Sequence, residues 1–159
     1  MPRKVTKSLV RPVEPDRIYN STAVAKLINR AMNEGKKQLA ERLVYNGMQK
    51  AATQLKVQNP LEVFEQAMKN IQPHLETRSR RVGGANYQIP FEVKGQRQQH
   101  LAIMWFVAAA RDRKGMSMQD RIAAELVDAY NNGGAAVKKK EDTHRMAEAN
   151  RAFAHFARS

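Results

Sequence analysis

Four histidines, His74, His100, His144 and His155, are the side chains best suited to acid–base or metal chemistry. His144 and Glu148 are one helical turn apart, a spacing that would suit two metal ligands on one helix face. No second histidine stands at the spacing of a zinc-binding helix, so we favour an ordinary surface pair. The chain also has no Walker-type phosphate loop and no nucleophile beside a base, and it contains no cysteine. We therefore expect no enzymatic activity, no cofactor, no metal site and no small-molecule substrate.

Lysine and arginine are the other residues with usable chemistry, because they bind anions. Together they number 28 against 15 Asp and Glu, which gives a formal net charge of +13 and a pI of about 10.3. Charge of this size indicates a polyanionic partner, most simply nucleic acid. We expect no membrane partner, since no long apolar span is present and the basic segments have few apolar anchors.

The basic residues cluster where the chain is expected to turn. One group lies on an N-terminal arm, and a second follows Gly35 at the start of a helix, where free backbone N–H groups also favour an anion. Others lie toward the tip of a hairpin, at its base, and around the loop after the fourth helix. The candidate nucleic-acid-binding residues are Arg3, Lys4, Lys36, Lys37, Arg78, Arg80, Arg81, Arg97, Arg111, Arg113 and Lys114. The alternative is that these cations only solvate the surface, as we expect for the run 138–140, which acidic residues follow.

Helical periodicity predicts the elements that must position these groups. We expect helices from about 21 to 34, 36 to 55, 60 to 72, 96 to 112 and 117 to 130, and a last one from 135 toward the C-terminus. The third has the clearest start, with Asn59 as a cap, Pro60 in the first turn and Glu62 completing a capping box. The expected apolar faces include Leu39, Leu43, Gly47, Ala51 and Leu55 in the second helix, Leu101, Met104, Trp105 and Ala108 in the fourth, and Val137, Met146, Ala149 and Phe153 in the last.

Residues 74–93 have a different pattern. Gly83 and Gly84 indicate a tight turn, and Tyr87, Ile89 and Val93 favour strands, so this segment is predicted to be a β-hairpin with a basic first strand. A single hairpin cannot bury itself, so its base must lean on the helices and its tip must project.

The predicted fold is mainly α: a single bundle of about six helices with a protruding β-hairpin arm between helices three and four. Residues 1–17 are expected to form a basic extended arm, and 18–159 a single domain. Charge alone does not separate RNA from DNA as the partner. An architectural DNA-binding protein with a basic β-arm is the alternative, although the hairpin tip has only Val82 near the place of an intercalating wedge.

Three blocks of the sequence resemble the bacterial-type small-subunit ribosomal protein seven family. They are Asn20 to Gly47, with NEGKKQLAERLVYNG at its centre, Ser79 to Val93 (SRRVGGANYQIPFEV), and Ala135 to His155 (AAVKKKEDTHRMAEANRAFAH). The blocks are in the family's order and spacing, and the similarity extends over nearly the whole chain.

The resemblance implies a structural, primary rRNA-binding protein of the small ribosomal subunit that binds the 3′ major domain and nucleates assembly of the subunit head. It implies rRNA contacts by Lys36, Lys37, Arg78, Arg80, Arg81 and the Arg113–Lys114 loop. It further implies exit-site tRNA near the hairpin tip, and the small-subunit ribosomal proteins numbered nine and eleven as neighbours. The expected location is the ribosome in a bacterial cytoplasm or in an organelle of bacterial descent.

Overall fold

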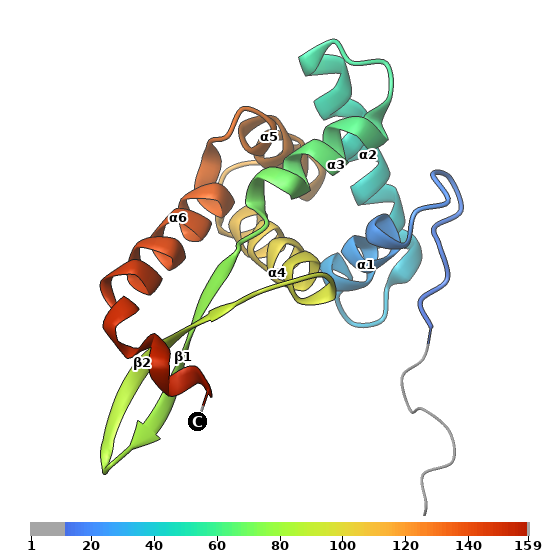
Figure 1. Cartoon of the computed structure of the whole chain (residues 1–159). Helices are drawn as coiled ribbons and strands as arrows, with labels where there is room; N and C mark the ends of the chain where they lie inside the picture. The colour runs from blue at the N-terminus through green and yellow to red at the C-terminus, as the bar shows by residue number, and fades with distance from the viewer. Residues whose placement is uncertain (1–11, 159) are drawn as a thin grey trace, which may run out of the picture.

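The computed structural model describes residues 12–158, which form a helical body and a two-stranded arm (Figure 1). The expected N-terminal contacts, Arg3 and Lys4, lie outside the described residues, as does most of the expected arm, 1–17. The elements are α1 (Thr22–Ala31), α2 (Lys37–Leu55), α3 (Pro60–Ile71), β1 (Leu75–Val82), β2 (Ala85–Glu92), α4 (Gln96–Asp112), α5 (Met118–Tyr130), α6 (Gly134–Ala149) and the 3-10 helix η1 (Arg151–Arg158). The mainly α fold with a hairpin between the third and fourth helices is confirmed.

Side-chain caps begin two helices, α3 and α5, where the sequence predicts them. The Asn59 side chain accepts a hydrogen bond from the Leu61 N–H at 3.1 Å, and the Ser117 side chain caps α5 by accepting from the Asp120 N–H. Glu62 accepts a hydrogen bond from the side-chain amide of Asn59, at 3.2 Å. A capping box would place Glu62 on the backbone N–H of Asn59, so that detail of the prediction is wrong.

The α-helices pack around a core whose largest buried side chains include Phe64, Phe106 and Met48. Helices α2 and α5 lie close together at Gly47, where an added Cβ would lie only 2.7 Å from Ile122 Cγ2. That distance is shorter than carbon–carbon contact allows, so the absence of a side chain at Gly47 sets how closely these two helices pack.

The predicted apolar faces of α2 and α4 need correction. In α2 the buried residues include Ala40, Val44 and Met48, whereas Leu39 is 49% exposed. In α4 Ala108 is exposed, and Phe106 and its neighbours face the core instead. The reason in both helices is that small buried alanines, which carry little hydrophobic signal, line much of the packed face.

The last helix is also shorter than expected. Helix α6 ends at Ala149, and the segment with Phe153 continues as η1. Met146, expected on the apolar face, is 49% exposed. Phe153 packs instead on the hairpin residue Tyr87, with ring centroids 5.0 Å apart, so the C-terminal segment turns toward the arm.

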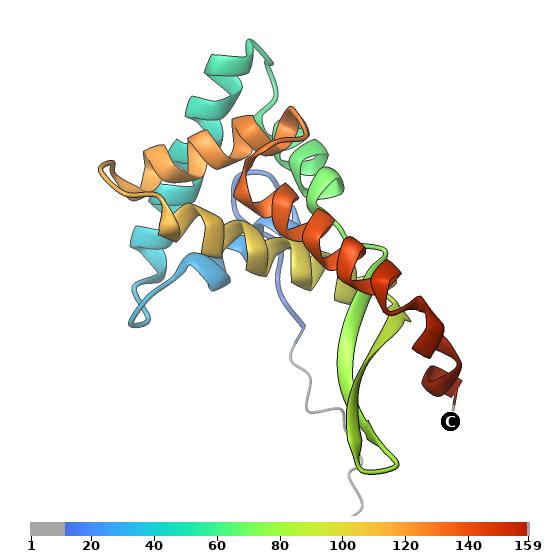
Figure 2. The same cartoon turned by 90° about the vertical axis from the view of Figure 1, so that its left-hand side faces the viewer.

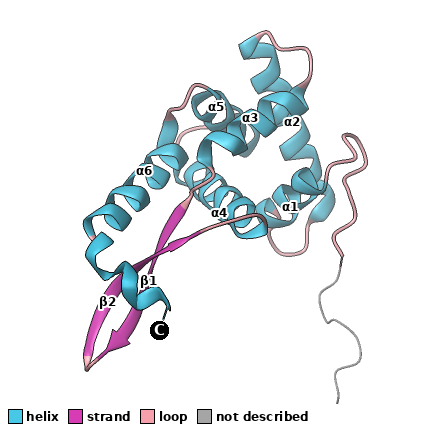
Figure 3. Cartoon of the chain, viewed as in Figure 1, coloured by secondary structure: helices cyan, strands magenta, loops and turns pink. Residues whose placement is uncertain are grey.

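The hairpin is an antiparallel pair with the register Leu75↔Glu92 through Val82↔Ala85. Gly83 and Gly84 form its two-residue loop with φ of +56° and +91°, the left-handed conformations that a type I′ turn requires. The base is buried around Ile89, while the middle and tip are largely exposed. Figures 2 and 3 show the arm leaving the body beside α4 and α6, with η1 alongside it.

The segment that leads into α1 is held by one buried carboxylate. Asp16 accepts hydrogen bonds from the backbone N–H groups of Ile18, Tyr19 and Ser21 and from the Tyr45 hydroxyl. Burial, together with the negative charge of Asp16, raises the pKa of Tyr45 to about 12, so this hydroxyl remains a proton donor. The chain before α1 is thereby fastened to α2.

Candidate nucleic-acid interface

Helix α4 determines where the candidate cations lie relative to one another. Arg97 is in its first turn, next to the hairpin base, and Arg111 is in its last turn. An α-helix rises about 1.5 Å per residue, so the two positions are about 21 Å apart along the axis. Arg97, His100, Met104, Ala108 and Arg111 follow the spacing of one helix face, which we call the α4 stripe, and all five are exposed or half-buried.

Near the C-terminal end of the stripe, three chain segments come together. Lys36 caps α2 and Lys37 begins it, while Arg111 reaches across from α4. The Arg111 guanidinium lies 3.4 Å from the backbone carbonyl oxygens of Arg30 and Ala31, at the end of α1. Lys36 and Arg111 line the same hollow, of about 480 Å³. The structure thus brings these predicted residues together from separate parts of the sequence.

At the other end of the stripe, the hairpin base is organised by Glu76, whose side chain is only 8% exposed. It pairs with Arg78 on its own strand and with Arg97 of α4, whose Nε and Nη2 lie 3.2 and 3.0 Å from Glu76 Oε2. Burial disfavours the carboxylate, but the hydrogen bonds and charges of the two guanidinium groups outweigh it and lower the pKa of Glu76. Arg78 also lies 5.2 Å above the Phe91 ring. Both predicted arginines are therefore fixed in orientation.

Farther along the arm, Arg80 and Arg81 point to opposite faces, because successive strand residues alternate. Arg80 Nη1 donates to the backbone carbonyl of Phe156 at 3.0 Å, which ties the hairpin to η1. Arg81 is exposed near the tip. Within residues 12–158, Lys37, Arg81 and Lys114 have no carboxylate partner.

Arg113 differs from the other candidates because its main contacts are internal. Its guanidinium binds Glu125, which is 0% exposed, through Nε at 2.9 Å and Nη2 at 2.7 Å, and it also binds Asp128. Burial lowers its pKa, but the hydrogen bonds and charges of both acids outweigh this and raise the pKa of Arg113 overall. The side chain is 27% exposed, and its geometry suits a structural role at least as well as an RNA contact.

Sequence reasoning missed Lys26, Arg30 and His100, which lie between the two ends of the stripe. Lys26 and Arg30 are one turn apart on α1, facing α4, and Lys26 Nζ donates to Gln99 Oε1 of α4 at 2.7 Å. For Lys26 and Arg30, the signal in the sequence was their i, i+4 spacing on a helix whose other face is apolar. Together with the predicted residues, Lys26 and Arg30 extend a line of cations from the hairpin base to the α1–α2 loop.

The described residues contain no group of three His, Cys, Asp or Glu side chains placed to hold a metal ion. His144 is used within the fold: its Nε2 accepts the backbone N–H of His74 at 3.0 Å, and the two rings stack with centroids 6.1 Å apart. Between residues 12 and 158, none of the helices combines the length and apolarity needed to cross a membrane.

A helical body, a projecting basic arm and a line of cations between them define a class of protein suited to bind a polyanion along an extended surface. The chain matches the family model described as Ribosomal protein S7p/S5e over residues 2–151. Similar proteins, each named Small ribosomal subunit protein uS7, come from three bacteria. The protein of Carboxydothermus hydrogenoformans is 58% identical over 146 residues, 92% of this chain and 93% of that protein. The protein of Chloroflexus aggregans is 55% identical over 148 residues, which are 93% of this chain and 94% of that protein. The protein of Protochlamydia amoebophila is 51% identical over 146 residues, which are 92% of this chain and 93% of that protein.

The chain belongs to the Ribosomal protein S7p/S5e family. It is a bacterial-type ribosomal protein of the small subunit, part of the ribosome in the cytoplasm, and a structural protein rather than an enzyme. The resemblance stated from the sequence is confirmed.

Proposed function

We propose that the chain is a primary rRNA-binding protein that binds the 3′ major domain of small-subunit rRNA and nucleates assembly of the subunit head. The observation that supports this most strongly is the line of cations along the α4 stripe and α1, continued by the hairpin. Phosphates neutralised along such a line release counterions, which drives binding to folded RNA. A-form helices hide base edges in a deep major groove, so recognition would rest on shape and backbone contacts.

The arm supports the proposed position near exit-site tRNA. It projects from the body, and its tip around Gly83 and Gly84 is exposed (Figure 2). Val82, the large apolar residue nearest the tip, is half-buried, so the tip offers little of the wedge that DNA-bending arms insert. This favours RNA over the architectural DNA-binding alternative.

The remaining proposals concern partners and domain organisation. The small-subunit ribosomal proteins numbered nine and eleven are proposed neighbours, and the exposed side chains of Leu39 and Met116 offer apolar surface for contacts between proteins. We keep the proposal that residues 18–159 form one rRNA-binding domain preceded by an arm, 1–17. The core shared by the six α-helices between residues 12 and 158 supports the single domain.

A competition titration tests the rRNA proposal. The chain is titrated against the 3′ major domain of small-subunit rRNA at physiological salt, with an equal mass of duplex DNA as competitor. We expect RNA binding to survive the competition and to weaken steeply as salt rises. Equal competition by DNA would favour the alternative function.

A charge-reversal variant connects that result to the predicted residues. Changing Lys36, Lys37, Arg80 and Arg81 to Glu lowers the formal net charge by 8, from +13 to +5. Within the part of the chain that the structure describes, none of the four has a buried carboxylate partner, so helicity by circular dichroism should remain while RNA binding is lost. The matched control makes the same charge change at exposed positions away from the stripe, Lys56, Lys69, Lys138 and Lys139. Equal loss in both variants would show that net charge alone matters.

A further inference from the structure

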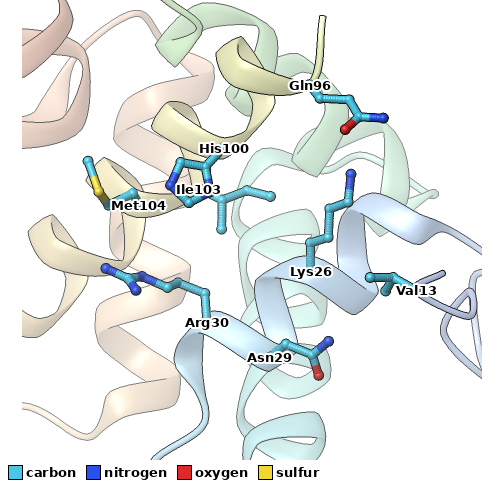
Figure 4. A pocket seen from close by; sticks show the side chains of 8 residues that line it. All are labelled: Val13, Lys26, Asn29, Arg30, Gln96, His100, Ile103 and Met104. Atoms are coloured by element: carbon cyan, nitrogen blue, oxygen red, sulfur yellow. The ribbon is translucent and has the colours of Figure 1, made fainter. Parts of the chain in front are cut away.

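A cavity of about 420 Å³ lies between α1 and α4, midway along the line of cations (Figure 4). Lys26 and Arg30 enter it from α1, and His100, Ile103 and Met104 enter it from α4. Its volume falls in the range of about 300–1,000 Å³ typical of sites for small organic ligands. The exposed lining is mostly apolar, and its polar groups are side chains of α1 and α4.

The charge around the cavity is positive. Among residues 12–158, those that line the cavity include no carboxylate that could act as a counterion. Lys26 donates to Gln99, whose amide is neutral, so the ammonium keeps its full charge. Three other hollows, beside Glu41, Glu34 and Glu62, each have an acidic residue in the wall. A fourth contains Lys50, but Asp120 neutralises that cation.

We propose that this cleft binds a single unpaired nucleotide of the rRNA. The inference rests on the proposed function and adds to it one nucleotide with a defined place on the protein. Lys26 and Arg30 bind the phosphate, and the half-buried Met104 contacts the face of the base, while Ile103, which is only 4% exposed, lies in the floor of the cleft. Bases splayed from loops and bulges are the parts of RNA that proteins enclose in this way, often against flat side chains such as the His100 ring.

A paired base does not fit this arrangement. In an A-form duplex both faces of each base are stacked, so only a nucleotide turned out of the stack can place its base between α1 and α4. The neighbouring phosphates then continue toward Arg97 at one end of the α4 stripe and toward Arg111 at the other. The position of the cleft between these arginines makes the bound nucleotide part of the same RNA segment.

Two variants separate the phosphate contact from the base contact. Lys26→Gln with Arg30→Gln removes both cations at helix positions where Gln is a good helix former. Met104→Trp fills the cleft from a half-buried position and keeps the charge. The control, Lys56→Gln with Lys69→Gln, also lowers the net charge by 2, from +13 to +11, at exposed residues that do not line the cavity.

Each protein is titrated against the 3′ major domain of small-subunit rRNA at several salt concentrations, and the bound RNA is probed chemically at its base edges. Loss of the phosphate contact that Lys26 and Arg30 share should reduce the slope of log affinity against log salt by about 1, whereas the control should leave it unchanged. Met104→Trp should weaken binding by about 5- to 150-fold, the range expected for one stacked base. It should also restore reactivity at one unpaired nucleotide that the unaltered protein protects, with the other protections retained.

The cleft proposal is wrong if both variants leave every protected nucleotide protected and the salt slope unchanged. A chain that protects no nucleotide of the 3′ major domain would overturn the proposed function itself, and the cleft proposal with it. The Gln double variant changes the half-buried Lys26 and the exposed Arg30 but no core residue, so it decides the question even if Met104→Trp disturbs packing. Circular dichroism of each variant verifies the fold.

Discussion

Removing Glu125 should destabilise this protein more than removing any exposed charge. Glu125 Oε2 accepts two hydrogen bonds from Arg113, and its Oε1 accepts the backbone N–H of Ala136 at 3.0 Å. One carboxylate in α5 therefore holds both the α4–α5 loop and the first turn of α6. We consider the variants Glu125→Ala, Arg113→Ala and Glu125→Gln.

The magnitude follows from burial. Breaking a buried ion pair by removing one partner costs about 3–5 kcal/mol, because the other charge is left desolvated. Glu125→Ala also leaves the Ala136 N–H without an acceptor, worth about 1–3 kcal/mol, although Asp128 still compensates part of the Arg113 charge. We therefore expect a loss of about 3–5 kcal/mol for each alanine variant, out of a total stability of about 5–15 kcal/mol. Glu125→Gln keeps an acceptor for Ala136 and should lose less.

Urea unfolding followed by circular dichroism measures these free energies. The exposed pair of Lys50 and Asp120 provides the control, since Lys50→Ala should change the free energy of unfolding by less than about 1 kcal/mol. The double alanine variant should lose about 0.5–3 kcal/mol less than the sum of the single losses. If Arg113→Ala unfolds like the unaltered chain but binds rRNA weakly, Arg113 is an RNA contact and this structural reasoning is refuted.

Three further predictions concern packing and pH. Gly47→Ala gains up to about 1 kcal/mol of helix propensity, but its Cβ would lie 2.7 Å from Ile122 and 3.1 Å from the Gln119 carbonyl oxygen. The overpacking cost of about 1–3 kcal/mol should exceed this gain, so Gly47→Ala should lower the urea midpoint. A raised urea midpoint would show that α2 and α5 can move apart. The pKa of Glu76 lies below its ordinary 4.5, so its stabilisation is present above pH 4.5 and is lost as pH falls through the lowered value. In Glu76→Gln, the free energy of unfolding should therefore depend less on pH between pH 3 and 6. The same pH dependence in the variant and the unaltered chain would contradict this prediction. Burial first, then the charges of Lys140 and His74, lower the pKa of His144 from 6.5, so stability should decline as pH falls from 6.5 toward the lowered value. In His144→Gln, the urea midpoint should fall less over this pH range. If it falls as much as in the unaltered chain, another group causes the pH dependence.

Where a structural signal is local, the sequence predicts it well. Asn59, Ser117 and the pair Gly83–Gly84 act on backbone groups within a few residues, so the starts of α3 and α5 and the turn of the hairpin are all found. The predicted faces of α2 and α4 are less accurate, because orientation depends on what the neighbouring helices leave room for. Ala108 is exposed although Ala109 is buried, and the residue type alone does not distinguish these two positions.

The candidate interface shows the same limit for charges. The positions of the cations are visible in the sequence, but their partners are not, since Arg97 pairs with a carboxylate 21 residues away and Arg113 with one 12 residues away. Lys26 and Arg30 become part of a line only because α1 lies beside α4. Whether any of these residues contacts rRNA stays a prediction, which the variants above test.

Two of the buried acids, Glu76 and Glu125, resolve a conflict between charge and folding at this surface. A hairpin is marginally stable alone, and Arg78 and Arg80, which lie on the same face of β1, repel each other, which weakens it further. Glu76 offsets that repulsion at the base while fixing Arg78 and Arg97, and Glu125 does the same for Arg113 beside Lys114. Arg81 and Lys114 are two of the described cations that lack such a partner, and each lies on backbone that a paired neighbour holds in place. A surface of this kind can stay strongly positive without losing its shape, which recognition of RNA by shape requires.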